Sequence, residues 1–292
     1  QLLESIKTCA PAPSLLSHNG VSTNITKANY LRKIDQIKEL IRSGEVYELN
    51  FCINHEISLP KGDGVQCFLK LTSSFDFPFA AYFKSDTYEI ISASPERFCK
   101  KEKSKIISQP IKGTAPRSTL PEVDTQQKEI LLNSIKDRAE NMMIVDLVRN
   151  DLAQICTTGT VAVDELFGIY SYPTVHQMIS TVSGYLQKDI NFLKLLQALF
   201  PMGSMTGAPK RNVMMHIDKL ENFNRGAYSG TLGYITPEGD FDFNVLIRTL
   251  IINSKLGMGN YGVGSAITID SNPDEEWQEC MLKSKMLHNF FE

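Results

Sequence analysis

The sequence predicts an α+β fold in which the sheets are antiparallel. Strand-like runs follow one another at hairpin distance, and helical segments stand between them without a regular strand–helix–strand order. No internal repeat or low-complexity linker divides the 292 residues, and this length is sufficient for a large hydrophobic core. We therefore expect sheets built from hairpins and accompanied by helices.

The N-terminal part of the chain is predicted to pass from an irregular segment into a helix and then a strand. Prolines and an Asn-Gly pair predict that residues 1–25 are irregular. Apolar residues at helical spacing predict a helix over about 29–43, which Gly44 ends. Over about 46–57, apolar residues alternate with Glu48 and other polar residues, so this segment is predicted to be a strand with one polar face.

The same criteria predict the remaining elements. Helices are expected at about residues 65–73, 121–152, 191–200 and 209–220, and from Pro273 to the end. Strands are expected at about residues 79–84, 88–92, 96–100, 105–111, 160–165, 171–185, 227–235, 241–252 and 258–269. The basic residues of 100–105 lie between two of these strands and are predicted to form a solvated hairpin tip.

Composition and charge exclude several classes of protein. The 30 basic and 33 acidic residues give a formal net charge of -3 and form no basic stripe, so we expect no nucleic-acid partner. The sequence has no apolar run of about 18 residues and no signal peptide, so we expect no membrane association. The 6 cysteines lack the spacing of a zinc site, which is typical of reduced thiols in a cytoplasmic protein. The chain begins with Gln1 in place of Met, so upstream residues are expected to be missing.

Lys112 is the most informative residue of the sequence. It lies in the run Gln109–Arg117, which has a proline near each end and a Gly-Thr pair that suggests a turn. An acid, Glu96, lies in the nearby run Ser94–Phe98. An amine and a carboxyl group framed by turn residues suggest a nucleophile and a proton donor. The alternative is an ordinary solvated lysine, since lysines are almost never buried unless they are paired.

Two predicted helices carry acidic faces. Asp137 and Glu140 stand at i and i+3 of one helix, and Glu276, Glu279 and Lys283 share a face of the last helix. Alone, each pattern is most simply a helix face in contact with water. If the two faces met across a cleft, their oxygens would suit Mg²⁺ and leave coordination sites for water and for a ligand carboxylate.

Several other residues suggest binding. Arg248 lies in an apolar run predicted as a strand, where its charge needs a carboxylate partner from a ligand or from the protein. Gly262 and Gly264 within the next strand indicate close approach of another group to the backbone. The loop 203–210 lacks the spacing of a phosphate loop, so nucleotide binding is not expected, although its helix N-terminus can favour an anion. His176, a single histidine within a strand, is most simply structural.

Taken together, these runs resemble the signatures of the chorismate-utilising enzymes, a family that includes anthranilate, aminodeoxychorismate, isochorismate and salicylate synthases. The resemblance is carried, in unbroken order over 27–290, by Ser94–Phe98, Pro110–Arg117, Asp137–Leu152, Gly203–Lys210, Ala227–Tyr234 and Gly262–Lys283. It implies a sandwich of two packed antiparallel β-sheets, with helices outside and the active site in a cleft between the sheets. It also implies that residues 1–26 are an irregular remnant of a longer N-terminal region and that 27–292 form the chorismate-binding catalytic domain.

Lys112 indicates which branch of the family the chain resembles. Anthranilate synthases carry Ala at the matching position, whereas component I of the aminodeoxychorismate synthases carries Lys. The resemblance therefore implies conversion of chorismate and ammonia to 4-amino-4-deoxychorismate, on the route to p-aminobenzoate and folate. Lys112 matches a nucleophile that forms a covalent intermediate, and Glu96 matches the general acid that protonates the departing hydroxyl group. Anthranilate synthase, isochorismate synthase and a non-catalytic chorismate-binding scaffold remain as alternatives.

The resemblance also implies the remaining site residues and partners. Mg²⁺ would be held by Glu140 and Glu279, with Asp137 and Glu276 acting through water. Chorismate would be bound by Arg248, Tyr228, Gly262, Gly264, Gly113, Thr114, His176 and Lys283. The chain has no glutaminase triad, so it would use free ammonia or ammonia from a separate glutamine amidotransferase subunit.

Two residues of the cleft carry further expectations. A lysine with an ordinary pKa of about 10.4 is almost fully charged at neutral pH, so a nucleophilic Lys112 is expected to be desolvated and to have a depressed pKa. At the position of Glu48, most amine-adding relatives have Gln, and the water-adding branch has Lys. Glu48 therefore disfavours the addition of water, and it would either attract ammonium or make a structural hydrogen bond.

Overall fold

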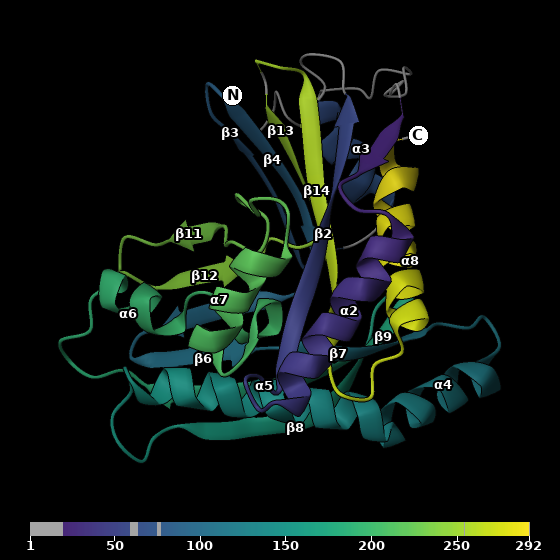
Figure 1. The fold of residues 1–292 in the computed structure, drawn as a ribbon. Helices are drawn as coiled ribbons and strands as arrows, with labels where there is room; N and C mark the ends of the chain where they lie inside the picture. Colours follow the sequence, from purple (N-terminus) through teal and green to yellow (C-terminus); the bar gives the residue numbers. More distant parts are fainter. Residues whose placement is uncertain (1–19, 59–63, 75–76, 254, 292) are drawn as a thin grey trace.

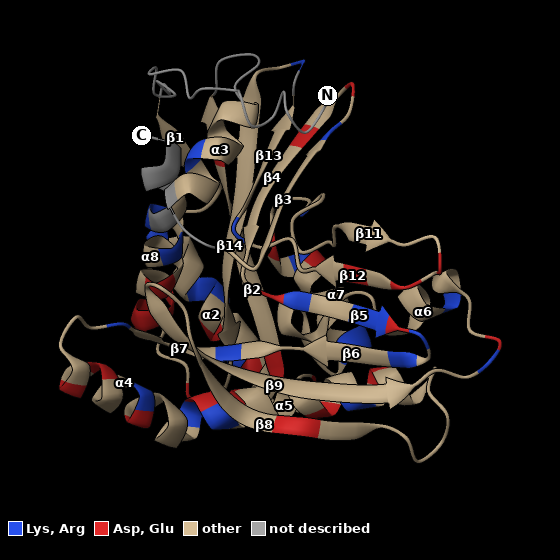
Figure 2. Cartoon of the chain, turned by 180° about the vertical axis from the view of Figure 1, so that it is seen from behind, with Lys and Arg blue, Asp and Glu red and all other residues tan. Residues whose placement is uncertain are grey.

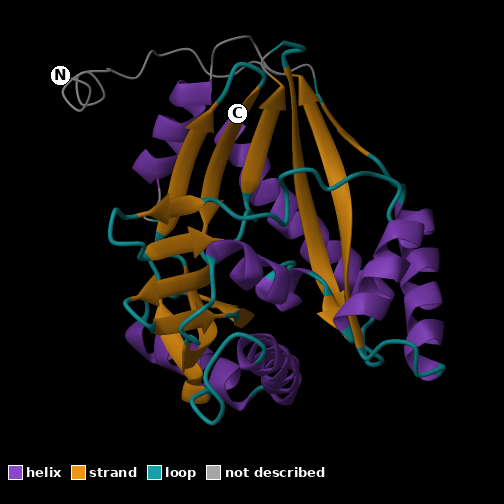
Figure 3. Cartoon of the chain, turned by 90° about the vertical axis from the view of Figure 1, so that its left-hand side faces the viewer, coloured by secondary structure: helices purple, strands orange, loops and turns teal. Residues whose placement is uncertain are grey.

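The computed structural model describes residues 20–58, 64–74, 77–253 and 255–291, and these residues form two antiparallel sheets. The first sheet has the strand order β1-β2-β14-β13-β4-β3 with β10 beside β2, and the second has the order β11-β12-β5-β6-β9-β7 with β8 beside β9. Figure 3 shows the sheets as two layers whose strands run in different directions. The predicted α+β fold with two packed antiparallel sheets is confirmed.

The strands of each sheet come from separated parts of the chain. The first sheet consists of β1 (Val21–Thr23), β2 (Glu48–Ser58), β3 (Phe79–Lys84), β4 (Tyr88–Ser94), β10 (Gly207–Ala208), β13 (Thr249–Asn253) and β14 (Met258–Ile267). The second consists of β5 (Arg97–Glu102), β6 (Lys105–Gln109), β7 (Ile111–Pro116), β8 (Ala162–Ser171), β9 (Val175–Tyr185), β11 (Gly233–Ile235) and β12 (Phe241–Asn244). The long central pair is β2 with β14, which hydrogen-bond over the whole length of β14.

The helices lie against both sheets. They are α2 (Lys27–Arg42), α3 (Gly64–Ser74), α4 (Pro121–Asn133), α5 (Ile135–Ala153), α6 (Phe192–Leu199), α7 (Lys210–Leu220) and α8 (Pro273–Phe291), with a short 3₁₀ turn, η1 (Gly203–Met205). In Figure 1, α2 and α8 run side by side along the first sheet, and α5 lies beneath the second. Figure 2 shows basic and acidic residues interspersed along α4, α5 and β5. No helix in the described part of the chain is both long and apolar enough to cross a lipid bilayer.

Each sheet has its own apolar core, because the helix faces that the sequence marks as apolar pack on it. On the first sheet, the fully buried Tyr30 of α2 packs against Phe51 of β2 and Trp277 of α8, with ring centroids 5.5 and 5.1 Å apart. On the second sheet, Ile144 of α5 packs in one cluster with Val182 of β9. The described cysteines are buried, as predicted, and Cys52, Cys99, Cys156 and Cys280 are free thiols, while Cys9 lies outside the described residues.

Two predicted elements are interrupted. The predicted helix 121–152 is two helices, because Ser134 has an extended backbone and its hydroxyl group accepts the Asp137 N–H, which starts α5. The predicted strand 105–111 ends before Pro110, whose nitrogen has no hydrogen to donate to a ladder, and a separate strand, β7, begins after it. The run that contains Lys112 is therefore a strand with a bulge between Ile111 and Thr114, and the turn predicted there is wrong.

Other boundaries differ for tertiary reasons. Residues 21–23 form β1, so the irregular segment predicted for residues 1–26 is wrong there, while residues 1–19 lie outside the described part. Of the predicted strand 227–235, only 233–235 pairs with a neighbour. On the polar face of β2, Glu48, Asn50 and Asn54 are buried by other parts of the chain, and Glu56 near the end of the strand is exposed.

Two of the connections between the sheets lie beside each other, and we call them the paired crossings: residues 95–96 after β4 and residues 245–248 after β12. Hydrogen bonds join them, from Ala93 N to Arg248 O at 3.1 Å and from Val245 N to Glu96 O at 3.0 Å. The predicted strand 241–252 is therefore broken, and Arg248 does not lie on a strand. Its φ of 49° is in the left-handed region, which a non-glycine residue rarely adopts.

Candidate active site

Lys112 of β7 and Glu48 of β2 meet between the two sheets. The Lys112 Nζ donates a hydrogen bond to Glu48 Oε1 at 2.9 Å, and the side chains are 10% and 0% exposed. The interpretation of Lys112 as a solvated lysine is therefore wrong, and Glu48 takes the structural hydrogen bond that was one of its two expected roles. The other oxygen, Glu48 Oε2, has no hydrogen-bond partner among the residues that the structure describes.

The charge of Lys112 differs from the expectation. Burial alone would lower the pKa of Lys112, but the carboxylates of Glu48, Glu140 and Glu96 act in the opposite direction and prevail. The pKa therefore lies above its ordinary value, and the predicted depression of the Lys112 pKa is wrong. The lysine is desolvated, as expected, but it is held as an ammonium ion by the acids around it.

Glu96 lies in the first of the paired crossings and is 5% exposed. Burial raises its pKa to about 7, although the Ser204 hydroxyl group, the Lys112 ammonium and a hydrogen bond with the backbone of Ile111 act to lower it. A carboxyl group with this pKa is partly protonated at neutral pH, which a proton donor requires.

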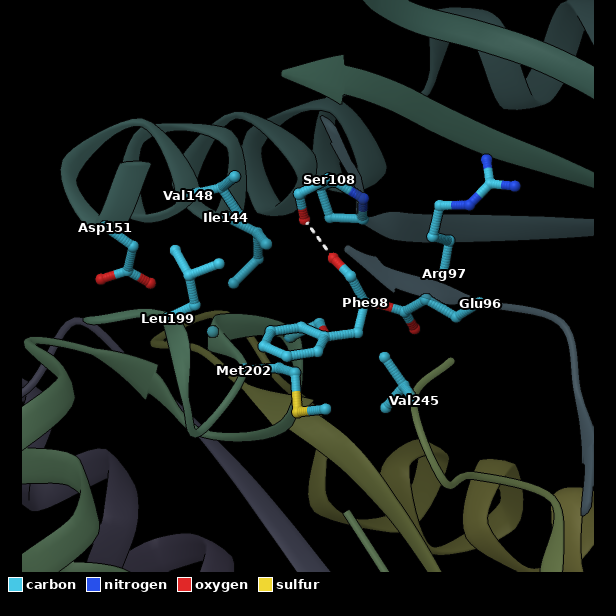
Figure 4. Close-up of a pocket in the computed structure, with 13 residues that line it drawn as sticks. Glu96, Arg97, Phe98, Ser108, Ile144, Val148, Asp151, Leu199, Met202 and Val245 are labelled. Carbon is cyan, nitrogen blue, oxygen red and sulfur yellow. Dashed lines mark hydrogen bonds between the residues drawn. The ribbon is translucent and has the colours of Figure 1, made fainter. Parts of the chain in front are cut away.

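A cavity of about 20 Å³ lies beside Glu96. In Figure 4, Glu96 stands at one end of the lining residues and Asp151 of α5 at the other, with Phe98 and Met202 between them. The space is about large enough for one small molecule such as water. Because most of its lining is apolar, few groups on this side can solvate a charged Glu96, and this explains the raised pKa.

The acidic faces of α5 and α8 meet, as a shared cation site requires. Lys136 of α5 lies between them, with its Nζ 3.9 Å from Glu140 Oε1 and 3.6 Å from Glu276 Oε1. Farther along α8, Glu279 forms an ion pair with Lys283 at 2.6 Å. The structure thus brings together carboxylates that the sequence placed on two separate helices.

Glu140 is a carboxyl group whose burial is only partly offset by nearby positive charge. Burial raises its pKa to about 7, and the attraction of Lys112 opposes this shift only in part. Its Oε1 accepts no hydrogen bond from the described residues. Within the described ranges, no three His, Cys, Asp or Glu side chains stand close enough together to enclose a metal ion. A set of oxygen donors with one orphaned buried oxygen nevertheless fits a hard cation that keeps part of its water, such as Mg²⁺.

Arg248, in the second crossing, has a partly buried guanidinium group. Its side chain forms no ion pair or hydrogen bond with the described residues, and burial lowers its pKa. The alternative of an internal salt bridge is therefore wrong. An unpaired guanidinium in this position can form a bidentate pair with a ligand carboxylate.

Gly262 and Gly264 of β14 permit close approach, but by protein side chains. A Cβ atom on Gly262 would lie 2.4 Å from the ring of Tyr228, and one on Gly264 would lie 2.6 Å from Cys52 Sγ. The Tyr228 hydroxyl group and Cys52 Sγ are themselves 3.7 Å apart. The Lys283 Nζ donates to the carbonyl oxygen of Gly264 at 2.8 Å, so the middle of α8 is tied to the same strand.

The remaining predicted residues lie on the second sheet. Gly113 has a φ of 92° and would place a Cβ atom 2.9 Å from Asp137 Cβ, so β7 passes directly against the start of α5. Thr114 is exposed. His176 is 0% exposed, and its nitrogens lie 2.9 Å from Asp124 Oδ1 and 3.0 Å from Ser171 Oγ. Because both ring nitrogens have protein partners, the structural alternative is favoured for His176.

Two residues of the site were not found from the sequence. Lys136 precedes Glu140 by one helical turn, and this spacing predicts a contact, so its signal was available. Ser204 contributes a hydroxyl group to Glu96 from η1, far along the chain, and no local pattern predicts that contact.

Comparison with known proteins identifies the family of the chain. The family model of chorismate binding enzymes matches residues 2–289. The chain is 40% identical over 267 residues to aminodeoxychorismate synthase component 1 of Salmonella typhimurium, which covers 91% of this chain and 58% of that protein. It is 39% identical over 263 residues to the chloroplastic aminodeoxychorismate synthase of Arabidopsis thaliana, which covers 89% of this chain and 28% of that protein. The chain thus spans a little more than half of component 1.

Solved structures share the fold. Anthranilate synthase component I from Streptococcus pneumoniae superposes with a TM-score of 0.86 at 28% sequence identity, covering 98% of this chain and 64% of that one. The menaquinone-specific isochorismate synthase MenF of Escherichia coli has a TM-score of 0.84 at 20% identity, covering 98% of this chain and 66% of that one, and this likeness concerns the fold alone.

Proposed function

The chain belongs to the chorismate binding enzymes, and we propose that it carries the catalytic part of an aminodeoxychorismate synthase component I. Such an enzyme converts chorismate and ammonia to 4-amino-4-deoxychorismate. The observation that carries the proposal is the buried Lys112 amine, which lies between the sheets beside a carboxyl group, Glu96, whose pKa is about 7. A nucleophile and a proton donor are the two groups that replacement of a ring hydroxyl group needs.

Each step of the proposed reaction uses a described residue. Lys112, as a neutral amine, forms a bond from Nζ to ring C2 while the C4–O bond breaks. Glu96 gives its proton to the departing hydroxyl group, which leaves as water. Ammonia then bonds to C4, the C2–Nζ bond breaks, and Lys112 is released. The net change is replacement of the C4 hydroxyl group by an amino group.

The remaining residues bind and orient chorismate. The unpaired guanidinium of Arg248 would bind one of the two carboxylates of the substrate. Glu140 and Glu279 would hold Mg²⁺, with Asp137 and Glu276 acting through water. When bound, Mg²⁺ would supply positive charge for the other carboxylate of the substrate.

We further propose a partner and a location. The chain would receive ammonia from a separate glutamine amidotransferase subunit, and the printed name component 1 of its relatives implies a second component. The free, buried thiols of Cys52, Cys99, Cys156 and Cys280 suit a reducing compartment and support a cytoplasmic location.

Anthranilate synthase is the second candidate, because a solved member of that group shares the whole fold. In that reaction ammonia itself attacks C2, and a lysine nucleophile is not needed. The position of Lys112 in the cleft favours the aminodeoxychorismate reaction.

Product analysis tests the proposal. The protein is incubated with chorismate, Mg²⁺ and ammonium chloride at mildly alkaline pH, and the products are separated by chromatography. We expect 4-amino-4-deoxychorismate from wild type and its loss, or a change to anthranilate, in Lys112→Ala. Anthranilate or isochorismate from wild type would contradict the proposal. Removal of Mg²⁺ by a chelator should abolish turnover, and re-addition should restore it.

A further inference from the structure

Glu48 is a second acid in direct contact with the nucleophile, and the proposed reaction has not used it. Its side chain is fully buried on β2, with Oε1 bonded to the Lys112 Nζ at 2.9 Å. Its Oε2 lies within the interior without a hydrogen-bond partner among the described residues. Burying a carboxylate oxygen without a hydrogen-bond partner costs free energy of folding, so this oxygen is a candidate for a functional role.

Lys112 needs a proton acceptor within the cleft. An ammonium nitrogen has no lone pair and cannot attack carbon, so one proton must leave before the reaction begins. Four carboxyl groups from four elements surround Lys112 and hold it charged: Glu48 of β2, Glu96 of the first crossing, Glu140 of α5 and Glu279 of α8. The side chain is only 10% exposed, so bulk water has little access to it.

The roles of the other three acids leave Glu48 as the acceptor of the Lys112 proton. Glu96 must hold a proton in order to release it to the departing hydroxyl group, so it cannot take another. Glu140 and Glu279 would be occupied by the cation. Glu48 has no other role, is already hydrogen-bonded to the proton in question, and has a free oxygen.

We infer that Glu48 is the base that activates Lys112, a role that rests on the proposed function. The Nζ–H bond breaks, its electron pair stays on Nζ, and the proton moves to a carboxylate oxygen of Glu48. The ammonium and carboxylate become an amine and a carboxylic acid, so the net charge of the pair does not change. When ammonia later releases Lys112 from the ring, the amine recovers this proton from Glu48. The product amine enters as an ammonium group and loses its extra proton to Glu96, which restores both acids.

The inference makes a distinctive prediction about pH. Because the proton stays inside the pair, the activation of Lys112 needs no exchange with the solvent. The remaining pH dependence is that of the proton donor, because the pKa of Glu96 is about 7 and its protonated fraction falls above that pH. The rate at saturating chorismate and constant free ammonia should therefore fall by about tenfold per pH unit above about pH 8. If Lys112 instead lost its proton to water, the growing neutral fraction of the lysine would offset the loss of protonated Glu96. The same rate would then be nearly independent of pH from about pH 8 up to the pKa of the lysine.

Glu48→Gln tests the role directly, because the amide keeps the size and the hydrogen-bond acceptor but cannot accept the proton. We expect its rate near pH 7 to fall by about 10²-fold or more, and the ratio of the variant rate to the wild-type rate to recover by about tenfold per pH unit. Glu56→Gln is the matched control, since Glu56 is an exposed glutamate on the same strand, and it should retain the wild-type profile. A wild-type rate that stays independent of pH above about pH 8, or a Glu48→Gln profile parallel to wild type, would overturn the inference.

The two proposals fail in different ways in this experiment. If wild type makes no aminodeoxychorismate at any pH, the proposed function is wrong. If the product forms but its wild-type rate does not fall with pH above about pH 8, the function stands and the role of Glu48 is wrong. The wild-type profile alone decides this second point, so the test does not depend on the folding of the variant.

Discussion

Replacement of Lys112 by methionine should destabilise the protein, because it leaves Glu48 as a buried carboxylate without a partner. The two charged groups are 2.9 Å apart, and an effective dielectric constant of about 20 gives an attraction of about 6 kcal/mol at that distance. In the variant, Glu48 keeps its desolvation cost but loses this attraction. We expect the free energy of unfolding to fall by about 3–5 kcal/mol.

A second substitution separates the charge from the packing. Glu48→Gln in the Lys112→Met background removes the stranded carboxylate, so most of the lost stability should return. The coupling energy of the cycle formed by wild type, the two single variants and the double variant should be about 2 kcal/mol or more. Urea denaturation of the four proteins, followed by circular dichroism at about pH 7, measures it.

The pH dependence of the coupling follows from the direction of the Lys112 pKa shift. The pKa is higher in the folded protein than in the unfolded chain. The pair therefore contributes its full stability below about pH 10.4, and this contribution is lost as the pH rises through the folded-state value. The coupling should thus be the same at about pH 7 and about pH 9. If Lys112→Met were within about 1 kcal/mol of wild type, the pair would not be buried and coupled as described.

Three further predictions concern other parts of the site. Arg248→Gly should raise the KM for chorismate by about tenfold or more, because a charged contact is lost, and steady-state kinetics measures this. The same substitution should stabilise the fold by about 1 kcal/mol, because glycine adopts the left-handed backbone without strain, and thermal denaturation measures this. Because the pKa of Glu96 is about 7 in the folded protein, against about 4.3 for an ordinary glutamate, stability should decline by up to about 3 kcal/mol as the pH rises from about 4 to about 8. Glu96→Gln should remove this part of the pH dependence in a series of thermal melts, and an unchanged dependence would contradict the assignment. Gly262→Ala should cost about 1–3 kcal/mol of stability in urea denaturation, because its Cβ would lie 2.4 Å from the Tyr228 ring.

The sequence was sufficient to predict helices and strands whose pattern depends only on nearby residues. The apolar stripe of α2 and the alternation in β2 depend only on which residues face the core, and both elements lie where they were predicted. The division between α4 and α5 also had a local signal, because Ser134 stands three residues before Asp137 in the manner of a helix cap. It was missed because the flanking residues favour a helix on both sides.

Tertiary contacts decide the features that the sequence left open. Residues 241–252 have the pattern of one long strand, and only the change from one sheet to the other breaks it at Arg248. Similarly, the alternation in β2 indicated a polar face but not what covers it. The raised pKa of Lys112 arises from acids on four different elements, and no spacing along the chain predicts such a gathering.

The paired crossings have a mechanical consequence for the cleft. They connect the two sheets side by side, and Glu96 and Arg248 lie in them. If one sheet rotated relative to the other about the paired crossings, residues in the crossings would keep their mutual distance, while groups on opposite sheets would separate. Glu48 and Lys112 are on opposite sheets. A small rotation of one sheet would therefore separate this ion pair and admit chorismate to the cleft. Glu96 and the Arg248 guanidinium group would keep their positions and meet the entering molecule.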